Sequence, residues 1–463
     1  MTAVALAAIL LSGSGLCALA SGREATGRWL PASVLAGAGL WSMMYAAALF
    51  AFGASIRVMM TKDAALIAAG AAALLLSRRR TTAPLATPAP APAWCRRVLT
   101  VTVLVATALF VEHTIRFPDG GADAWAIWNL RARSLARAGE SFRDAFSPEL
   151  LFWAHQDYPL LLPGLVAQFF RITGTESFWV SAALAWAIAA AEVWLLWRTL
   201  ANLRSGQWGI LATLLLVSTP AFLTFAANQQ ADVPISAFLL LATSSLAVAL
   251  EHGPRASLLL LSGAALSMCA WTKNEGLLYL GCTLLALVVA RRTEALRARF
   301  HDALLVLAGA LPGLLLLVVF KRSFAHENDL TPFVSPHDAV ARAASLHGWW
   351  TLLVAWMRRF VYVQAWGFHL LATVAAVVYL GRRPHELPDS TRILAWTLGL
   401  ALCGFAAMYL LQPYPLLWFF RASIDRVSIH LWPSALFATF LALASSASLN
   451  RQVENGRGRP GSP

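Results

Sequence analysis

Long apolar segments alternate with short polar ones along almost the whole chain of 463 residues. A membrane-spanning helix needs roughly 20 apolar residues. About thirteen segments approach this length. They are 1–20, 30–55, 63–77, 98–113, 177–197, 209–226, 233–250, 257–271, 277–290, 302–320, 361–381, 393–411 and 428–448. The pattern predicts an all-α polytopic transmembrane protein.

The composition agrees with this class, because 59% of the residues are hydrophobic and only 13% are charged. The net charge of +13 suggests nucleic acid at first sight. The arginines, however, form short clusters between apolar segments, which is typical of cytoplasmic loops in membrane proteins. No nucleic-acid partner is therefore expected. The sequence also contains no Walker A, Rossmann glycine, G-x-S-x-G or zincin motif, so it does not support use of a nucleotide-sugar donor on the cytoplasmic side.

The basic clusters predict the orientation of the chain in the membrane. A Pro/Ala/Arg linker at 78–97, the stretches 291–300 and 382–392, and a tail at 450–463 should be cytoplasmic. If these segments are cytoplasmic, the outer side should contain the segments 114–176, 227–232, 272–276, 321–348 and 412–427. Residues 1–77 are expected to be accessory transmembrane helices without chemistry, and 98–449 the catalytic module, with 114–176 as its long first outer loop.

Two segments decide whether this orientation holds. The alternation requires that 158–172, with two prolines, does not span, and we expect it to be a half-inserted or interfacial helix. The segment 339–362 mixes apolar residues with four basic or histidine side chains. It is either an interfacial helix or a tilted span with basic residues at one end.

Ionisable residues from separate loops gather on the predicted outer side. They are Asp119, Asp123, His155, Asp157, Asp232, Lys273, Glu275, Arg421 and Arg426. Ionisable groups near membrane depth are costly, so they tend to be functional or paired with one another. Their convergence on one side of the membrane predicts a single site.

Four stretches contain residues of this set: DAWAIWNLRAR, HQDYPLLLP, NQQADVP and WTKNEG. Together they resemble bacterial polytopic glycosyltransferases of the GT-C superfamily. This superfamily includes protein O-mannosyltransferase and aminoarabinose transferase relatives. The resemblance covers roughly 98–448. It implies a membrane transferase that takes a sugar from a polyprenyl-phosphate carrier. It also implies a carboxylate in the first outer loop, a position that Asp123 occupies, and a second acidic residue in the next outer loop, matched by Asp232. The resemblance departs from oligosaccharyltransferases in one respect, because we expect no soluble outer domain after the last span.

These residue types suit sugar transfer from a lipid phosphate. A carboxylate can accept the proton of the acceptor as general base. Cations can stabilise the phosphate that leaves. We predict Asp123, Asp232 and Asp157 as catalytic carboxylates, and Lys273, Arg426, His155, Glu275 and Trp125 as substrate-binding residues. A divalent cation, Mg or Mn, is the candidate cofactor, with Asp123 and Asp232 as its candidate ligands.

Each candidate also has a structural interpretation. Asp123, Asp157 with His155, and Asp232 could cap helices, and Asp119 lies in Pro-Asp-Gly, which is typical of a turn. Trp125 and Trp128 could anchor the loop at the membrane interface. Lys273 and Glu275 could simply pair with each other, and Asp425 could be the partner of Arg421 or Arg426. Arg131 and Arg133 could bind headgroups or form a solvated face.

The sequence therefore predicts a multi-pass glycosyltransferase, transferring a hexosyl or pentosyl group, in a bacterial inner membrane. Its donor would be a polyprenyl-phosphate sugar and its acceptor a cell-envelope glycan, lipid or protein on the extracytoplasmic side. The alternative is a secondary transporter or a lipid-carrier flippase. Transporters commonly show paired halves with matching broken helices, and no such repeat is evident here.

Overall fold

The computed structural model describes residues 1–21, 29–78, 91–137, 139–147, 149, 155–251, 255–291, 294–325, 335–361, 366–380, 387–412 and 414–443. Over these residues the chain is built from helices, without a β-strand element, so the predicted all-α class is confirmed. Most of the predicted 78–97 linker and the whole 450–463 tail lie outside the described residues.

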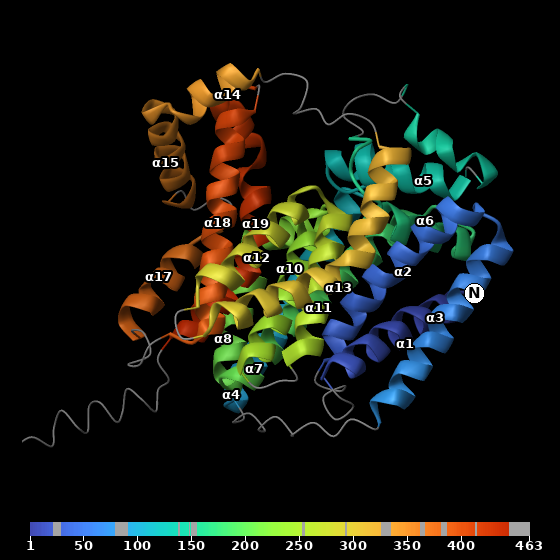
Figure 1. The fold of residues 1–463 in the computed structure, drawn as a ribbon, viewed down its shortest axis with the longest axis horizontal. Coiled ribbons are helices and arrows are strands. Elements are labelled where there is room, and N and C mark those ends of the chain that lie inside the picture. Colours follow the sequence, from blue (N-terminus) through green and yellow to red (C-terminus); the bar gives the residue numbers. More distant parts are fainter. Residues whose placement is uncertain are drawn as a thin grey trace, which may run out of the picture.

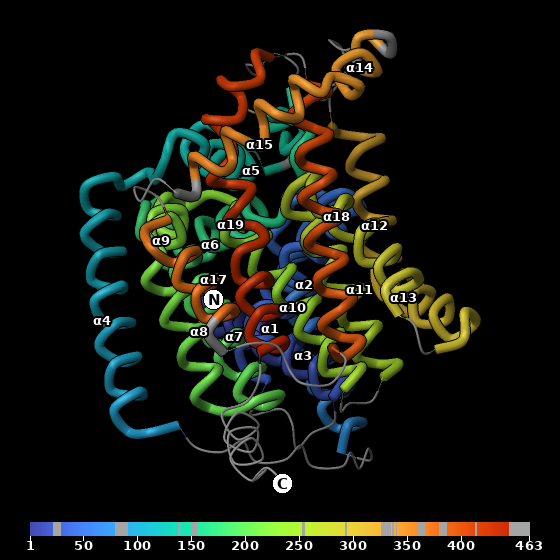
Figure 2. The backbone as a smooth tube through the Cα atoms, turned by 90° about the vertical axis from the view of Figure 1, so that its left-hand side faces the viewer, coloured from blue at the N-terminus to red at the C-terminus, as the bar shows by residue number. Residues whose placement is uncertain are grey.

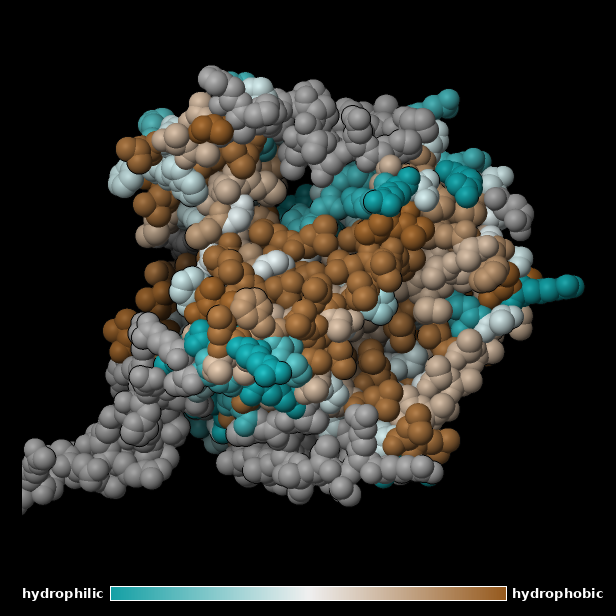
Figure 3. All heavy atoms as spheres, viewed as in Figure 1, coloured by the Kyte–Doolittle hydropathy of each residue, from teal (hydrophilic) through white to brown (hydrophobic). Residues whose placement is uncertain are grey.

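Nine helices of the described chain are long and apolar enough to cross a membrane. They are α1 (Thr2–Ser21), α2 (Leu30–Phe52), α3 (Ile56–Ser77), α4 (Ala93–Arg116), α7 (Phe178–Leu203), α10 (Asp232–Glu251), α11 (Arg255–Thr272), α13 (Leu296–Ser323) and α18 (Asp389–Leu411). Hydrophobic residues form a broad belt across one face of the molecule, with hydrophilic residues above and below it (Figure 3). The protein is therefore a multi-pass membrane protein.

Other predicted spans are bent or short in the structure. The segment 209–226 forms α8 (Gly206–Ser218) and α9 (Pro220–Ala227), which meet at a bend of 65°. Pro220 has no N–H to continue the helix there. The helices α12 (Glu275–Val289) and α17 (His369–Leu380) have 15 and 12 residues. The total of about thirteen spans stays a prediction.

The segment 339–362 is not one long span. It forms two helices, α14 (Pro336–Ala343) and α15 (Leu346–Val361), which are separated at Ala344 and Ser345. The Ser345 hydroxyl accepts a hydrogen bond from the Gly348 N–H in the first turn of α15. The last helix, α19 (Leu416–Ala442), begins earlier than the predicted span 428–448 and therefore carries Arg421 and Arg426 within it.

Helix α6 (Leu161–Thr173) has 13 residues, so it is short, as a non-spanning segment requires. All of its residues from Leu161 to Phe170 are buried, because it packs against α5 (Leu130–Arg137), α2 and α7. Protein, rather than lipid, covers its apolar surface. Whether this helix is half-inserted or interfacial in the membrane stays a prediction.

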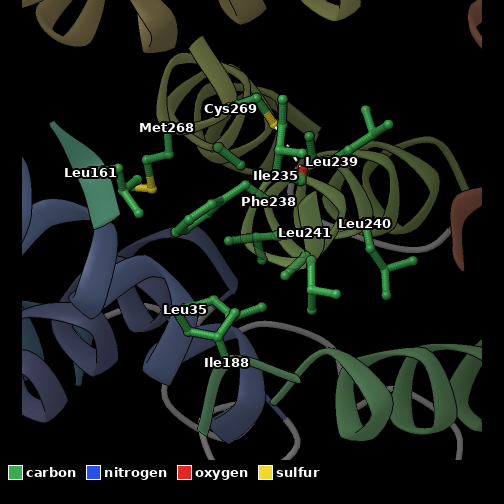
Figure 4. Close-up of a cluster of buried hydrophobic side chains, with 14 of the residues drawn as sticks. Leu35, Leu161, Ile188, Ile235, Phe238, Leu239, Leu240, Leu241, Met268 and Cys269 are labelled. Carbon is green, nitrogen blue, oxygen red and sulfur yellow. Dashed lines mark hydrogen bonds between the residues drawn. The ribbon is translucent and has the colours of Figure 1, made fainter. Parts of the chain in front are cut away.

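The centre of the molecule is α10, which packs against α11, α19 and α7 (Figure 1). Every residue from Asp232 to Ala249 is buried. The close-up in Figure 4 shows α10 side chains such as Phe238 and Leu241 beside Leu35 of α2 and Met268 of α11. A helix that is apolar on all sides is expected at the core of a helical membrane bundle. Helix α10 therefore fixes the position of Asp232 at its first turn.

Helix α4 stands at the edge of the bundle (Figure 2). It packs against α8 and α9 but leaves many of its apolar side chains exposed, including Val101, Leu104 and Leu109. In a membrane these side chains would contact lipid. The loop that follows α4 contacts the bundle itself, for example through the Gly121 N–H and the Asn228 carbonyl.

The first three helices are tied to α6 by buried polar contacts. Asp63 of α3 lies 2.8 Å from Lys62 and accepts a hydrogen bond of 2.7 Å from the Trp41 indole of α2. Lys62 also donates to the Gln168 side chain of α6, and the Ser42 hydroxyl of α2 donates to the Leu161 carbonyl at 2.8 Å. The accessory module therefore supports the helix that directly follows Asp157. That residues 1–77 contribute no catalytic residue stays a prediction.

Replacing Asp63 by asparagine is expected to lower the free energy of unfolding by about 3–5 kcal/mol, because it leaves the buried Lys62 ammonium without an anion. Thermal unfolding of the purified protein in detergent measures the change. Glu112→Gln is the matched control, since Glu112 pairs with Arg116 at an exposed position and such pairs contribute roughly 0–1 kcal/mol. Equal shifts in the two variants would show that the Lys62 contact is not a buried ion pair.

Candidate functional site

The carboxylate of Asp232 lies at the centre of a buried polar cluster at one end of the bundle. Its Oδ1 atom is 3.1 Å from the Lys273 ammonium and 2.8 Å from Nε2 of His430. Its Oδ2 atom accepts a hydrogen bond of 3.3 Å from Nε of Arg426. The Asp232 side chain is fully buried. Three donors from α19 and the α11–α12 loop therefore satisfy this charge, and it does not cap the start of α10 as the structural interpretation proposed.

Arg426 joins this buried carboxylate to a second one at the edge of the cluster. Its Nη1 atom is 2.6 Å from Oδ2 of Asp123, while its Nε atom faces Asp232. The side chains of Arg426 and Asp123 are 23% and 29% exposed, whereas that of Asp232 is inaccessible. A ligand that approaches the cluster therefore reaches Asp123 and Arg426 first.

Asp123 is presented by an irregular helix that begins just after α4. The π-helix η2 (Ala124–Asn129) follows Asp123, whose side chain makes no capping hydrogen bond. Such π-helical turns are frequent at functional sites because they change the direction of a side chain. Asn129 donates to the Gln229 side chain at 3.2 Å, and Gln229 donates to the Pro118 carbonyl at 3.0 Å. The loop between α9 and α10 thereby holds the segment that carries Asp123.

Gly120 allows this contact between the two loops. Its φ of +76° is in the left-handed region, and a Cβ atom there would lie 2.4 Å from the Asn228 carbonyl oxygen. The next N–H, from Gly121, donates to that same oxygen at 3.0 Å. A side chain at position 120 would therefore push the loop away from Asn228.

Gly120→Ala is expected to lower sugar transfer at least tenfold, since a displacement of about 1 Å at a reacting group can cost about 100-fold in rate. Gly174→Ala is the matched control: its φ is +69°, and a Cβ there would meet nothing within 4 Å. Both glycines have a left-handed φ, so the difference between the variants reports the close contacts at position 120 with Asn228 and Ala124. Rates of transfer by the two purified variants measure it, and equal rates would contradict this role for Gly120.

Asp157 forms a second group of contacts next to the first. Its Oδ2 atom accepts a hydrogen bond of 2.6 Å from the Asn274 amide and lies 3.6 Å from the Lys321 ammonium. Lys321 also donates to the Asp157 backbone carbonyl and, at 2.8 Å, to the Asn274 side chain. The end of α13 and the loop between α11 and α12 therefore meet at Asp157.

Arg131 fixes the backbone on either side of Asp157. Its guanidinium donates to the carbonyls of Tyr158 at 2.7 Å and His155 at 2.9 Å. Burial lowers the pKa of Arg131 to about 10, although the nearby charge of Asp157 opposes this shift. Arg131 is thus neither a headgroup ligand nor part of a solvated face.

Glu275 extends the cluster from the start of α12. Its Oε1 atom is 3.1 Å from the Lys273 ammonium, which also contacts Asp232. Within the described residues, its buried Oε2 atom has no hydrogen-bond partner. The pairing of Lys273 with Glu275 is therefore observed, but Lys273 joins two carboxylates rather than one.

The structure brings most of the predicted residues together. Asp123, Asp232, Arg426, Lys273 and Glu275 form one continuous set of ion pairs, and Asp157 adjoins them through Asn274. The side chains of the set come from predicted outer segments that are far apart in the sequence. Their roles in catalysis and substrate binding stay predictions.

Other candidates lie beside the cluster. Asp119 pairs with Arg133 at 2.7 Å, and the Trp125 side chain is 55% exposed. The His155 ring stacks on that of Tyr158 with centroids 4.9 Å apart. Arg421 is exposed on another part of α19. The suggestion that Asp425 is the partner of Arg421 or Arg426 was wrong.

Asp425 instead belongs to a contact between α19 and α15. It pairs with Arg359 of α15, and its Oδ1 atom accepts a hydrogen bond of 3.0 Å from the Trp366 indole. This carboxylate is therefore already bound by two donors. Arg426, the next residue, faces the opposite way into the cluster of Asp123 and Asp232.

Sequence reasoning missed four members of the cluster: His430, Tyr279, Asn274 and Lys321. Two of them could have been found from their spacing in the sequence. His430 follows Arg426, and Tyr279 follows Glu275, by one helical turn, so each pair shares a helix face. The Tyr279 hydroxyl lies 2.9 Å from Nδ1 of His430. Lys321, at the end of an apolar helix, has no such signal because only the fold brings it to Asp157.

The residues do not fit a metal ion bound between Asp123 and Asp232. The guanidinium of Arg426 lies between these carboxylates and contacts both. Within the described part of the chain, no group of three or more His, Cys, Asp or Glu side chains could hold a metal ion. The cation requirement stays a prediction, which transfer assays with and without a chelator would test.

A comparison with protein families supports a glycosyltransferase. Residues 157–319 match the model of the dolichyl-phosphate-mannose-protein mannosyltransferase family. This match covers roughly a third of the chain and includes Asp157, Asp232 and Lys273, but not Asp123 or Arg426. No curated protein matches the chain, and no solved structure matches it. Together with the transmembrane helices, the family match supports a membrane glycosyltransferase of GT-C type.

Proposed function

We propose that the protein transfers one sugar from a polyprenyl-phosphate-linked donor to an acceptor hydroxyl or amine at the outer side of a bacterial inner membrane. The observation that carries this proposal is the pair of Asp123 and Arg426 at the accessible edge of the cluster, with Asp232 buried behind it. A carboxylate and a guanidinium held side by side can act on both substrates, the acceptor and the donor. One accepts a proton, and the other binds phosphate.

In the proposed reaction the acceptor oxygen or nitrogen attacks the anomeric carbon of the sugar. The bond between this carbon and the phosphate oxygen breaks, and its electron pair stays on the phosphate. Asp123 accepts the proton that the acceptor loses. Arg426 donates hydrogen bonds to the phosphate as its charge develops. Binding of the donor phosphate at Arg426 would also release Asp123 from its ion pair, which leaves the carboxylate free to act as base.

Asp232 is proposed to position Arg426 rather than to touch the substrate. Its side chain is fully buried and is bound by Lys273 and His430 in addition to Arg426. A guanidinium between two carboxylates is held in one orientation, which lowers the cost of ordering it when substrate binds. The same argument makes Lys273, which is 3% exposed, a positioning residue instead of a direct phosphate ligand.

The region around Asp157 is the proposed binding site for the rest of the substrate. Lys321 is 31% exposed and Glu275 is 16% exposed, so both can contact a ligand from the same side as Asp123. His155 and Trp125 keep their proposed substrate-binding roles on the adjacent loop surface.

Assays of the protein in proteoliposomes distinguish a transferase from a transporter or flippase. The vesicles would contain a panel of radiolabelled polyprenyl-phosphate hexoses and pentoses, with envelope lipid, glycan and protein fractions as acceptors. A transferase moves the label onto an acceptor in detergent as well as in vesicles. Movement of the intact donor across the bilayer, without label in any acceptor, would refute the proposal and favour the flippase.

A further inference from the structure

A cavity lies between α15 and α19, and its lining includes no residue of the cluster of Asp123 and Asp232. It has a volume of about 450 Å³. Its polar lining is basic: Arg358 and Arg359 come from α15, and Arg421 comes from α19. Figure 1 shows α15 as a separate helix at the edge of the bundle, next to α18 and α19.

Among the residues that the structure describes, the positive charge of this cavity is not balanced by carboxylates. Arg359 is bound by Asp425. Arg358 and Arg421 are exposed, and neither of them forms an ion pair within the described residues. Three guanidinium groups thus face one carboxylate. Arginine side chains grouped in this way are suited to bind phosphate through paired hydrogen bonds.

Apart from Thr351, the remaining walls of the cavity are apolar. Trp350, Leu417 and Phe420 line it together with the arginines. The α15 helix carries exposed apolar side chains, Trp350 at 64% and Met357 at 59%, and has two arginines in its last turn. A helix with exposed tryptophan and basic residues is typical of a membrane interface. The cavity therefore offers an anion site and an apolar wall to the same molecule.

We propose that the cavity between α15 and α19 binds a lipid with a phosphate-bearing headgroup, the phosphate lying between Arg358 and Arg421 and the hydrocarbon chain along Trp350 and Leu417. A soluble anion would use only the arginines and would leave the exposed apolar side chains in water. The proposal concerns a site separate from the sugar-transfer cluster. It holds whether the lipid is an acceptor or a bound membrane component.

The test is a lipid titration of the purified full chain in a neutral detergent. Short-chain phosphatidylglycerol is added, and the thermal unfolding midpoint is followed. For wild type we expect a saturable rise in Tm. For Arg358→Gln/Arg421→Gln the half-saturating concentration should increase at least about tenfold, because two charge-assisted contacts are lost. Arg358→Lys/Arg421→Lys keeps the charge and should lie between the two.

One control variant and two control ligands test whether the effect requires these arginines and a lipid that carries a negative charge. Arg322→Gln removes an exposed arginine at the end of α13, near Lys321, and should respond as wild type does. Phosphatidylcholine supplies the chains without net negative charge, and inorganic phosphate supplies the anion alone; neither should reproduce the wild-type rise. An equal response of the double glutamine variant to phosphatidylglycerol would overturn the proposal. A full response to inorganic phosphate would also overturn it, since the ligand would then be a soluble anion.

Discussion

Asp123→Asn is expected to reduce sugar transfer by about 10²–10⁴-fold, the usual contribution of a general base. Asparagine has nearly the same shape, but its amide cannot accept the proton of the acceptor. The fold should survive the change, because Asp123 lies at the edge of the cluster with 29% of its side chain exposed. Initial rates with the purified variant measure the first effect, and the thermal unfolding midpoint measures the second.

Asp119→Asn is the control for this prediction. Asp119 belongs to the same loop and also pairs with an arginine, Arg133, but its side chain is 54% exposed and does not face Asp232. This variant should retain most of the activity. If Asp119→Asn lost transfer and Asp123→Asn kept it, the general base would have to be reassigned to Asp119.

Asp232→Asn is expected to lower the free energy of unfolding by about 3–5 kcal/mol and to abolish transfer. The substitution removes the anion that lies between Lys273 and Arg426 in a fully buried place, so both cations lose a partner at once. Thermal unfolding in detergent measures the loss of stability. The activity falls because Arg426 is no longer held in one orientation beside Asp123.

Glu192→Gln is the matched control for Asp232→Asn. Glu192 of α7 is also fully buried, but its described partner is the Ser236 hydroxyl at 2.8 Å rather than a cation. Its replacement by the amide should change stability much less. Combining Asp232→Asn with Lys273→Met should destabilise the protein by less than the sum of the two single changes, because both changes break the same ion pair. Equal losses of stability in Asp232→Asn and Glu192→Gln would show that the loss in Asp232→Asn does not come from its ion pairs.

The helices could be predicted from the sequence because each needs only a local apolar run. The predicted segments 30–55 and 233–250, for example, correspond to α2 and α10. Segments whose burial depends on neighbours could not be predicted in the same way. The burial of helix α6 is an example, because its own sequence does not reveal that α2, α5 and α7 enclose it.

The site could be predicted as a set of residues but not as a set of contacts. Loop orientation alone placed Asp123, Asp232 and Arg426 on one side of the membrane. Which atoms meet depends on how α10 and α19 pack, and that information is distributed over both helices. The link from Arg426 to both carboxylates therefore emerges only in the structure, as does the separation of Arg421 from Arg426.

The structure also changes the interpretation of the N-terminal helices. They lie outside the family match, and no motif in their sequence connects them with the site. Their buried contacts reach α6 through Lys62 and Ser42, directly after the segment that carries Asp157. We therefore propose that they support the shape of the substrate site, and a loss of transfer in Asp63→Asn at a temperature where the variant stays folded would support this role.

The most direct test of the proposed reaction is a mass balance on its two products. Purified protein in lipid nanodiscs would be incubated with a polyprenyl-phosphate sugar and envelope acceptors, and the lipid and acceptor fractions would be analysed by mass spectrometry. We predict that unglycosylated polyprenyl phosphate and glycosylated acceptor appear in equal amounts with wild type, and that neither appears with Asp123→Asn. Intact donor in every reaction of the panel, or equal product formation by Asp123→Asn, would contradict the proposed reaction.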